Sequence, residues 1–505
     1  MERHLLARQQ RFQQQGNTKE ECRIQNSAMN QEFGLLIDGN WCNGSDNRFG
    51  ELIDPANEQV IGWVAYASQT DLDLALAAAK KSFLTWRDTP VSTRVKILER
   101  AATLLYERVD TAALLLTCEQ GKPLRESRQE LIRAAETIAW NAKEAERILE
   151  YRSFPESDYR RFIVPEPIGV VAAFTPWNYP AVVSARKIAP ALAAGCTIIL
   201  KAAEETPSSA VAIATALIDA GLPPGVINLV FGDPPAISKH LLASPIIKKL
   251  SFTGSTAVGK QLAKLATDNL VRCTLELGGH APAIVFADAD VDAAAEAIAL
   301  YKFKGSGQSC NAPSRIYVDE TLYEPFLKRF TELVQNIRVG DGMEENTDMG
   351  PMANPRRIAA MERLVADAVA KGGCVVTGGK RLPRPGYFFL PTVLTEVPED
   401  AAIMNEEPFG PVITVAPFAD FDEAIHRANS NPYGLAAYVF SSSPVVAEAA
   451  ARALEVGSVG INQLSGVPPN APVGGIKDSG YGYEGGTEGL EAFLNLKLLS
   501  QKVLS

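Results

Sequence analysis

Two residues in separate turns of this sequence are suited to covalent chemistry on a carbonyl group. Cys310 ends the Gly/Ser-rich segment 305–310, and Glu276 ends an apolar run just before Gly278 and Gly279. A thiol in a tight turn can attack a carbonyl carbon, and a partly desolvated carboxylate with a raised pKa can accept a proton near neutral pH. We interpret Cys310 as a nucleophile and Glu276 as its general base. The alternatives are a small buried thiol and a salt-bridging or helix-capping glutamate.

A third turn supplies a hydrogen-bond donor for the same chemistry. Asn178 lies in the segment PWNYP, between Pro176 and Pro180, so its amide sits on a rigid loop. Together with the backbone N–H of Cys310, this amide could stabilise the oxyanion of a tetrahedral intermediate. The alternative is an asparagine that only stabilises the turn.

A Gly-rich turn at residues 252–259 follows an apolar run and precedes a helical pattern. Such a turn suits a pyrophosphate at a helix N-terminus. It lacks the GxGxxG spacing of the common dinucleotide fingerprint, so an ordinary helix start explains it equally well.

Two amphipathic helices precede these turns. The first is predicted to begin at Thr70, whose hydroxyl caps the amide of Asp73, and it places Ala75, Ala79 and Phe83 on one face. The second places apolar residues from Val95 to Val109 on one stripe. Both are expected to cover a sheet.

From residue 169 onward, short apolar runs alternate with helical segments. Such an alternation is typical of a parallel sheet covered on both faces, and it predicts an α/β fold. The expected strands are 169–174, 197–200, 226–230, 250–252, 274–277 and 283–286, with a helix at 208–220. A second α/β unit is expected after residue 310, with strands 315–318 and 375–377 and helices 322–337 and 355–370.

Composition excludes several classes of protein. A chain of 505 residues is expected to form two or three domains. Its net charge of -10 offers no basic field for nucleic acid. The seven cysteines and four histidines are scattered without CxxC or HExxH spacing, which argues against a disulfide framework and a bound metal and favours a reducing, cytoplasmic compartment.

Neither a membrane span nor a signal peptide is predicted. The apolar run 190–200 is too short to cross a bilayer. Residues 1–30 are rich in Gln, Asn and charge, which favours a disordered tail over a transit peptide. We expect no membrane partner.

The motifs PWNYP, FTGS, ELGG, GQSC and EEPFGP occur in this order. With them the sequence, from about Leu35 to its end, resembles the NAD(P)-dependent aldehyde dehydrogenase superfamily. The resemblance implies a variant Rossmann NAD-binding domain with five strands, a catalytic α/β domain and a small β oligomerisation arm. It also implies a homodimer or homotetramer, and the C-terminal tail could add an edge strand to another subunit. The expected boundaries are 1–33 for the tail, 34–147 and 168–280 for the NAD-binding domain, 281–480 for the catalytic domain, and 148–167 and 481–505 for the arm.

The resemblance also assigns roles residue by residue. Cys310, Glu276 and Asn178 match the nucleophile, base and oxyanion donor. Lys201 and Glu204 match residues on the adenine ribose, and Glu407 and Phe409 match the clamp on the nicotinamide ribose. The other implied cofactor contacts are Thr175, Pro176, Trp177, Gly232, Phe252, Gly254, Ser255 and Leu277.

Glu204 bears on the choice of cofactor, because a carboxylate would accept hydrogen bonds from a ribose 2′-OH and repel a 2′-phosphate. NAD is therefore favoured, with NADP as the alternative because Lys201 is nearby. The implied mechanism forms a thiohemiacetal on Cys310, passes a hydride to the cofactor, and hydrolyses the resulting thioester with water activated by Glu276.

Within the superfamily the sequence resembles the succinate-semialdehyde dehydrogenases, and Arg186 matches an arginine that binds the substrate carboxylate in that subgroup. Lys304 stands where a second arginine is expected, and Val467 where a serine is expected; Ala312 and Val473 also depart from the subgroup pattern. The expected substrate is a small-molecule semialdehyde. An aromatic or aryl-substituted aldehyde, a cofactor-independent esterase and a non-catalytic structural protein remain as alternatives.

Overall fold

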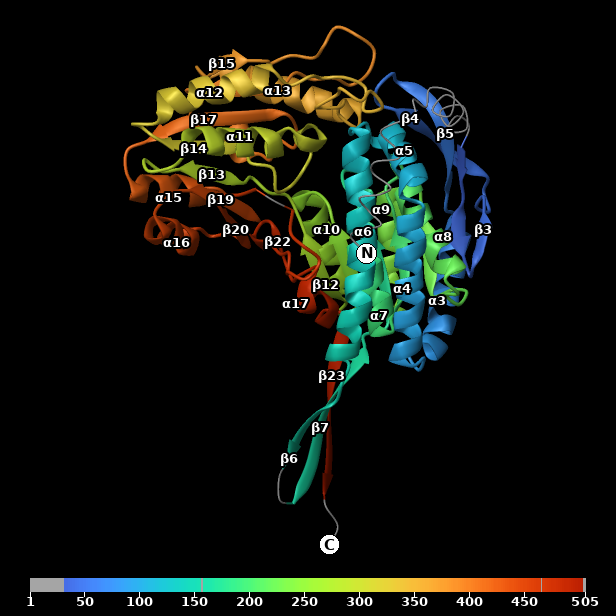
Figure 1. Ribbon diagram of the computed structural model, residues 1–505. Coiled ribbons are helices and arrows are strands. Elements are labelled where there is room, and N and C mark those ends of the chain that lie inside the picture. Colours follow the sequence, from blue (N-terminus) through green and yellow to red (C-terminus); the bar gives the residue numbers. More distant parts are fainter. Residues whose placement is uncertain (1–30, 156–157, 465, 503–505) are drawn as a thin grey trace, which may run out of the picture.

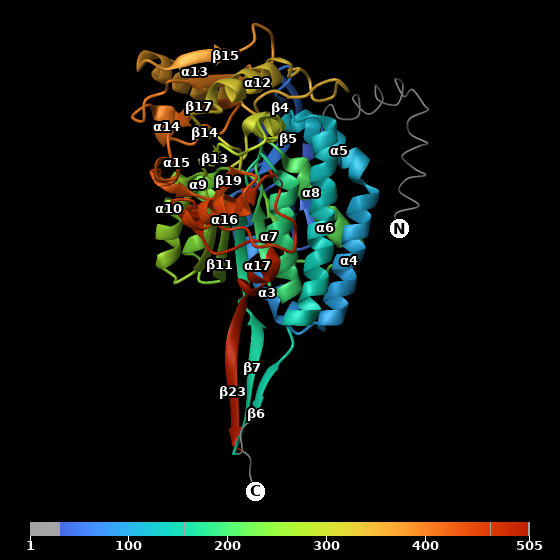
Figure 2. The ribbon, with the colours of Figure 1, turned by 60° about the vertical axis from the view of Figure 1, so that its left-hand side comes forward.

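The computed structural model describes residues 31–155, 158–464 and 466–502. Within these ranges the strands form two large sheets and three small ones (Figure 1). Each large sheet and its helices form a separate α/β unit, and a narrow arm of strands projects away from both units (Figure 2). No helix in the described ranges is long and apolar enough to cross a membrane.

The first large sheet has the strand order β22-β12-β11-β8-β9-β10-β2-β3 in the described chain. Its five central strands are parallel, as the alternation predicts, and they are almost wholly buried because their apolar residues meet helices on both faces. The strands are β2 (Leu35–Ile37), β3 (Asn40–Cys42), β8 (Val170–Phe174), β9 (Thr197–Lys201), β10 (Ile227–Val230), β11 (Ile247–Thr253), β12 (Arg272–Glu276) and β22 (Gly480–Tyr481).

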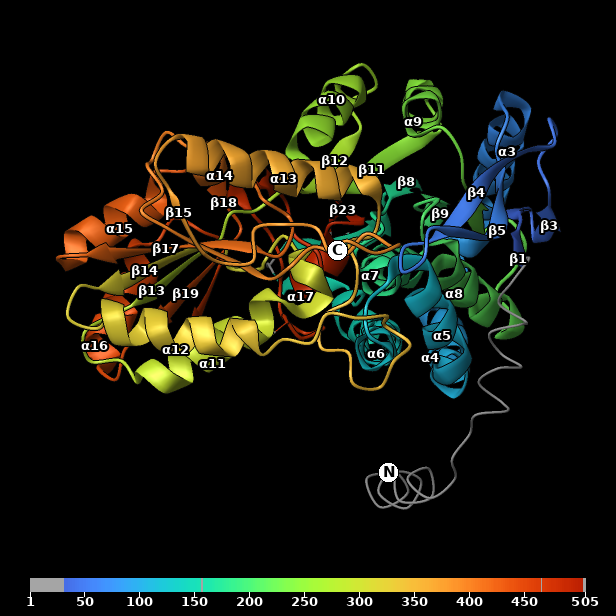
Figure 3. The same ribbon diagram turned by 90° about the horizontal axis from the view of Figure 1, so that it is seen from above.

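Helices cover both faces of this sheet (Figure 3). One face carries α3 (Gln69–Trp86), α9 (Pro234–Ala243) and α10 (Thr256–Thr267). The other carries α7 (Pro180–Ala194) and α8 (Pro207–Asp219), with an outer layer of α4 (Val91–Glu107), α5 (Val109–Gln120) and α6 (Leu124–Ile148).

Two helix boundaries differ from the prediction. The cap of α3 is Ser68, whose hydroxyl accepts from the amide of Asp71 while the Asp71 side chain accepts from the Ser68 amide. This reciprocal pair satisfies two amides, whereas a Thr70 cap would satisfy one. The second predicted stripe also breaks at Arg108, so Val109 begins α5 instead of ending α4.

The second large sheet has the order β15-β16-β17-β14-β13-β19-β20 among the described strands. Alternate residues of its strands point to α11 (Val291–Lys302) and α12 (Tyr323–Gln335) on one face and to α15 (Phe421–Asn429) and α16 (Pro444–Ala453) on the other. Helices α13 (Pro355–Ala370) and α14 (Ala402–Asn405) pack near β16. The strands are β13 (Pro282–Val285), β14 (Arg315–Asp319), β15 (Cys374–Thr377), β16 (Thr392–Thr395), β17 (Val412–Phe418), β19 (Ala436–Phe440) and β20 (Ser458–Ile461).

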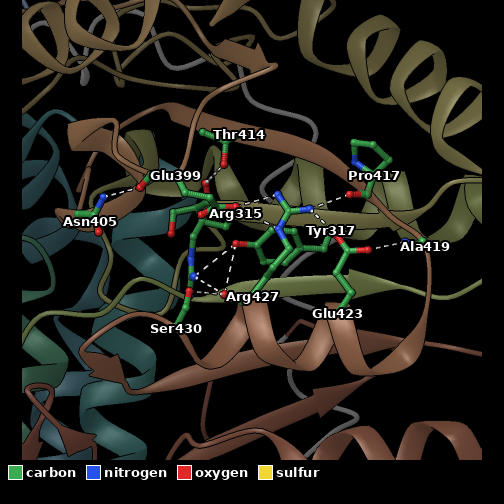
Figure 4. A network of polar contacts seen from close by, with 11 residues as sticks. Arg315, Tyr317, Glu399, Asn405, Thr414, Pro417, Ala419, Glu423, Arg427 and Ser430 are labelled. Carbon is green, nitrogen blue, oxygen red and sulfur yellow. Dashed lines mark hydrogen bonds and ion pairs between the residues drawn. The ribbon is translucent and has the colours of Figure 1, made fainter. Parts of the chain in front are cut away.

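A buried arginine fixes the segment that connects the two large sheets. Arg315 on β14 donates from Nε and Nη2 to the carbonyl of His280, at 3.2 and 2.8 Å, and from Nη2 to the carbonyl of Ala428 at 3.1 Å. Arg427 lies over the ring of Tyr317, 4.7 Å from its centroid, and extends the network to Glu399 (Figure 4). The connection after β12 is thereby fixed to the second sheet.

The arm consists of β6 (Arg152–Pro155), β7 (Tyr159–Pro167) and β23 (Leu494–Lys502), paired in the order β23-β7-β6. The predicted arm began its second part too early. Residues 480–481 form β22 of the first sheet, and α17 (Gly486–Glu491) packs on α6 and α7. The reason is burial, because Leu490 and Phe493 lie in the core of the first sheet.

The predicted tail also ended too late. Residues 1–30 lie outside the described residues, but 31–33 form β1 (Gln31–Phe33), which pairs in parallel with β5 (Gln59–Tyr66). The side chain of Phe33 is buried in the first core. The partner of β5 on its other edge is β4 (Arg48–Asp54).

Candidate active site

The loop that carries Cys310 follows α11 and has an unusual backbone. Gly305, Ser306 and Gly307 are consecutive left-handed residues, with φ of 55°, 57° and 69°. Ser306 offsets the cost of this conformation by donating its hydroxyl to the carbonyl of Gly350 at 2.8 Å. A Cβ at Gly307 would lie 2.3 Å from the carbonyl oxygen of Gly410, so the loop requires glycine there.

Gln308 connects this loop to Asn178. The Nδ2 of Asn178 donates to the carbonyl of Gln308 at 2.9 Å, and the Oε1 of Gln308 accepts from the amide of Ala353 at 3.0 Å. A side-chain amide has two N–H donors, so Asn178 retains a second one for a ligand. The structure therefore brings Asn178 to the loop of Cys310, as its predicted role requires.

A buried ion pair holds the PWNYP loop in place. The Nζ of Lys122 bonds the carbonyl of Asn178 at 2.6 Å and Oε2 of Glu130 at 2.5 Å. The Oε1 of Glu130 accepts from the amide of Ala181, in the first turn of α7, at 2.8 Å. We did not predict these two residues from the sequence. The signal available was a glutamate at an apolar-stripe position of α6, beside the buried Leu131.

Glu276 ends β12 and is buried, as predicted. Its Oε1 has no hydrogen-bond partner among the described residues. Burial raises the pKa of Glu276 well above the usual carboxyl value, and the charge of Glu484 adds to the rise, while the cations Lys187 and Arg186 oppose it. A carboxyl group with such a raised pKa is suited to proton transfer near neutral pH.

Lys187 lies between Glu484 and β11, the strand that pairs with β12 beside Glu276. Its Nζ bonds Glu484, and it also bonds Thr253 Oγ1 at 2.8 Å and Ser251 Oγ at 3.3 Å. Lys187 is fully buried. Its charge is thus compensated by Glu484 and by two hydroxyls.

Cys310 is partly exposed and free of any disulfide. Burial raises the pKa of its thiol to about 12, the charges of Glu407 and Glu276 contribute to the rise, and Arg186 opposes it. A Cβ at Gly279 would lie 2.2 Å from the carbonyl oxygen of Cys310. The backbone after Glu276 therefore touches the nucleophile's own residue, which brings the predicted pair together.

The predicted adenosine contacts lie at the ends of β9 and β10. Lys201 Nζ lies 2.7 Å from Oε1 and 2.8 Å from Oε2 of Glu204, and Glu204 Oε1 also accepts from the amide of Gly232 at 2.9 Å. The carboxylate is held by two neighbours and remains partly exposed. It is positioned to accept a further donor such as a ribose hydroxyl.

The predicted pyrophosphate turn joins β11 to α10. Ser255 is the N-cap, and its hydroxyl accepts from the amide of Val258. Gly254 packs on the ring of Phe252, since a Cβ there would lie 2.5 Å from the ring. Leu277 packs against Gly259 of α10 in the same way, since a Cβ on Gly259 would lie 2.3 Å from the Leu277 side chain. The turn is a helix start with a close backbone approach, which fits an anion.

The predicted nicotinamide-ribose residues approach the same point from the second sheet. Glu407 Oε1 accepts from the amide of Gly279 at 2.9 Å, and burial raises the pKa of Glu407 to about 7. The ring of Phe409 meets Trp177 edge-on, with centroids 5.6 Å apart. Thr175, which precedes Pro176 in that loop, has a buried hydroxyl without a partner in the described chain. This orphaned hydroxyl, together with the open position at Glu204, fits a bound dinucleotide.

The predicted substrate residues separate into two groups. Arg186 Nη2 bonds the carbonyl of Val467 at 3.2 Å, and its charge acts on both Cys310 and Glu276. Lys304 instead bonds Gln129 on α6 at 3.3 Å, and its charge acts on Glu126. Arg186 is therefore placed with the reacting groups, whereas the Lys304 side chain bonds α6.

Three tyrosines surround the Cys310 loop, and we did not predict them. Tyr438 donates its hydroxyl to the carbonyl of Asn311 at 2.7 Å, and its ring lies 5.9 Å from that of Tyr301. Tyr179 follows Asn178 directly, and its hydroxyl lies 3.4 Å from the position of a Cβ on Gly305. The sequence signal was a tyrosine within an apolar run for Tyr301 and Tyr438, and membership of the PWNYP motif for Tyr179.

The thiol of Cys310 should react slowly with alkylating agents at neutral pH. Because its pKa is raised to about 12, the thiolate fraction should rise about tenfold per pH unit without a plateau between about pH 7 and pH 10. Mass spectrometry of iodoacetamide-treated protein checks this, with the exposed Cys42 as an internal comparison. A plateau below about pH 9 at Cys310 would contradict the raised pKa.

Gly279→Ala should lower turnover of an aldehyde about 100-fold, since the new Cβ must push the Cys310 carbonyl away and misplace the thiol. Gly221→Ala is the control: its Cβ would meet no atom within 4 Å, although the backbone there has a φ of 92°. It should lose some stability and keep its turnover. Equal turnover in the two variants would show that the close contact is unimportant.

Comparison with known proteins gives a consistent result. The sequence pattern of the aldehyde dehydrogenase family matches residues 41–499. A putative 4-(hydroxymethyl)benzenesulfonate dehydrogenase, TsaD2 of Comamonas testosteroni, is 46% identical over 92% of this chain and 97% of that protein. The NADP(+) succinate-semialdehyde dehydrogenase GabD of Escherichia coli K12 is 41% identical over 92% of this chain and 96% of that protein.

The solved structures agree on the fold. The NAD+ complex of an aldehyde dehydrogenase from Bacillus cereus superposes with a TM-score of 0.92, at 34% identity, over 95% of this chain and 98% of that chain. The predicted α/β fold and the resemblance to aldehyde dehydrogenases are thereby confirmed. The chain belongs to the aldehyde dehydrogenase family and is an NAD(P)-dependent oxidoreductase that acts on an aldehyde group.

Proposed function

We propose that Cys310, Glu276 and Asn178 carry out the oxidation of an aldehyde to its carboxylate. The observation that supports this proposal is the close contact of Gly279, three residues after Glu276, with the Cys310 carbonyl. Cys310 attacks the aldehyde carbon, and the second N–H of Asn178 and the Cys310 amide stabilise the oxyanion. A dinucleotide held by Glu204, Glu407 and Phe409 would supply the hydride acceptor for this oxidation. Glu276 then takes a proton from the water that hydrolyses the Cys310 thioester.

NAD is proposed as the preferred cofactor. The Glu204 carboxylate would repel a 2′-phosphate, and Lys201, the cation that could attract one, is already paired with Glu204. The ratio of kcat/KM for NAD and NADP measures this preference. A ratio in favour of NADP would contradict the assignment.

The proposed substrate is an aldehyde with an anionic group at its far end. Arg186 supports this proposal, because the charge of its guanidinium opposes the rise in the pKa of Cys310. The guanidinium also retains N–H donors beyond the one that bonds the carbonyl of Val467. A semialdehyde such as succinic semialdehyde meets this requirement.

The tyrosines near Cys310 favour an aryl aldehyde, since Tyr301 and Tyr179 are partly exposed rings beside the thiol loop. The aryl sulfonate in the name of the relative from Comamonas testosteroni supports the same class.

A homodimer or homotetramer is proposed through the arm. Strand β23 pairs with β7 alone in the described chain, so its other edge is open. Leu496, Leu498 and Leu499 on this strand are exposed. An open edge with exposed leucines is suited to pairing with a second copy.

Glu276→Gln should give one burst of NADH per active site and then stall, because the thioester forms but its hydrolysis lacks a base. Rapid mixing with NAD and aldehyde, followed at about 340 nm, measures the burst, and intact-protein mass spectrometry detects the acyl group. Cys310→Ala is the control and should show neither. Unchanged steady turnover of Glu276→Gln would exclude the proposed role.

Arg186→Met should lower kcat/KM for anionic aldehydes about 10- to 100-fold more than for benzaldehyde, because a charge-assisted hydrogen bond is lost. Succinic semialdehyde, 4-formylbenzoate, 4-formylbenzenesulfonate and benzaldehyde form the panel. The ratio of anionic to neutral substrates is the readout, since Arg186 also lowers the pKa of Cys310. Lys304→Met is the matched control and should keep the wild-type ratio. An unchanged ratio in Arg186→Met would refute the anionic-substrate proposal.

A further inference from the structure

Phe409 has a backbone conformation that a residue with a side chain rarely adopts. Its φ is 45°, in the left-handed region that glycine favours, although Phe409 is not a glycine and directly follows Pro408. Such a conformation costs free energy and persists only where neighbouring groups enforce it. The groups that enforce it here can be named.

Arg357, in the first turns of α13, binds both peptide carbonyls of this strained segment. Its Nη2 donates to the carbonyls of Pro408 and Phe409, the latter at 3.2 Å. The same guanidinium lies over the ring of Phe409, 5.6 Å from its centroid. Trp177 meets that ring edge-on at 5.6 Å. The backbone and the ring of Phe409 are thus both held in one orientation.

The location of Arg357 is unfavourable for a cation in two respects. It lies near the positive N-terminal end of α13, which begins at Pro355. Its Nε is buried and has no hydrogen-bond partner among the described residues. The carboxylate of Glu407 is the acidic group whose charge favours the guanidinium. A cation at such an unfavourable position is expected to have a role in holding the loop that it binds.

We propose that Arg357 is a positioning residue that holds Phe409 and Glu407 in the geometry that binds the nicotinamide ribose. This inference rests on the proposed function, which assigns Glu407 and Phe409 to the cofactor. Arg357 acts through the two carbonyls and the ring, and it has no part in the chemistry on Cys310. Its loss should therefore weaken cofactor binding and leave cofactor-independent reactions of the thiol intact.

The neighbouring arginine provides a matched control. Arg356 pairs with Glu205 at 2.6 Å, and the side chain of Arg356 is 71% exposed. An exposed ion pair contributes little. Arg356→Met removes the same charge from the same turn of α13 without touching the Phe409 segment.

The experiment compares Arg357→Met, Arg357→Lys and Arg356→Met in the full chain. Titration calorimetry measures the Kd for NAD, steady-state kinetics give the KM for NAD, and hydrolysis of 4-nitrophenyl acetate without NAD reports on Cys310. Arg357→Met should raise Kd and KM for NAD about tenfold, the effect of losing a charged hydrogen bond. The Kd and KM of Arg357→Lys for NAD should lie between those of wild type and Arg357→Met, since lysine keeps the charge but loses the planar fork. Ester hydrolysis and the parameters of Arg356→Met should stay within about twofold of wild type.

Two outcomes would overturn the inference. One is an Arg357→Met protein that binds NAD as well as Arg356→Met. The other is a parallel loss of NAD binding and ester hydrolysis, which would indicate general damage to the fold. Glu407→Gln separates this failure from failure of the proposed function: if it weakens NAD binding while Arg357→Met does not, the clamp stands and only Arg357 is wrongly assigned. If Glu407→Gln also has no effect, the proposed cofactor site itself is wrong.

Discussion

The close approach of Gly279 to Cys310 is the constraint on which the site depends. Glu276 is the last residue of β12 in the first sheet, and the glycines of the segment that follows it pass against two loops of the second sheet. A Cβ at Gly279 would lie 2.2 Å from the Cys310 carbonyl, and one at Gly278 would lie 2.7 Å from Glu407 Oε2. Only a chain without side chains can occupy this space. The segment then continues to His280, whose carbonyl is bound by Arg315. The base, the nucleophile and the acidic residue of the Phe409 loop are therefore positioned by one short stretch of backbone.

Buried charge is concentrated around this contact. Burial raises the pKa of Glu276, Glu407 and the Cys310 thiol, so each would rather be neutral in the free protein. Arg186 opposes two of these shifts, at Cys310 and at Glu276. A buried carboxyl group with a raised pKa is suited to proton transfer near neutral pH, and a stable core gives no reason to bury one. The electrostatics thus agree with the chemistry suggested by residue types alone.

The sequence predicted the parts of this protein that depend on local pattern. The parallel strands could be read from buried apolar runs, and the site from glycine-rich turns beside Cys310 and Glu276. Long-range contacts could not be read in this way. Ser68 and Asp71 cap α3 through two reciprocal hydrogen bonds, but in the sequence they look like ordinary polar surface residues. Residues 486–493 return to the core of the first sheet, where Leu490 and Phe493 are buried. Lys304 lies six residues before Cys310 in the sequence, yet its side chain bonds Gln129 on α6. Nothing local encodes that direction.

Lys122 and Glu130 show why such long-range contacts matter for the site. Replacing a buried ion pair by apolar residues often leaves stability unchanged or improved, because desolvation offsets the attraction. Stability therefore gives little reason for charges at these two positions. Their remaining bonds do: Lys122 donates to the carbonyl of Asn178, and Glu130 accepts from the amide of Ala181, so the pair fixes the middle of the PWNYP segment and the residue that follows it. An apolar pair could fill the same volume but could not bond either group. Asn178 would then be free to turn away from Gln308, and an oxyanion donor contributes only when it is held in place before the charge develops.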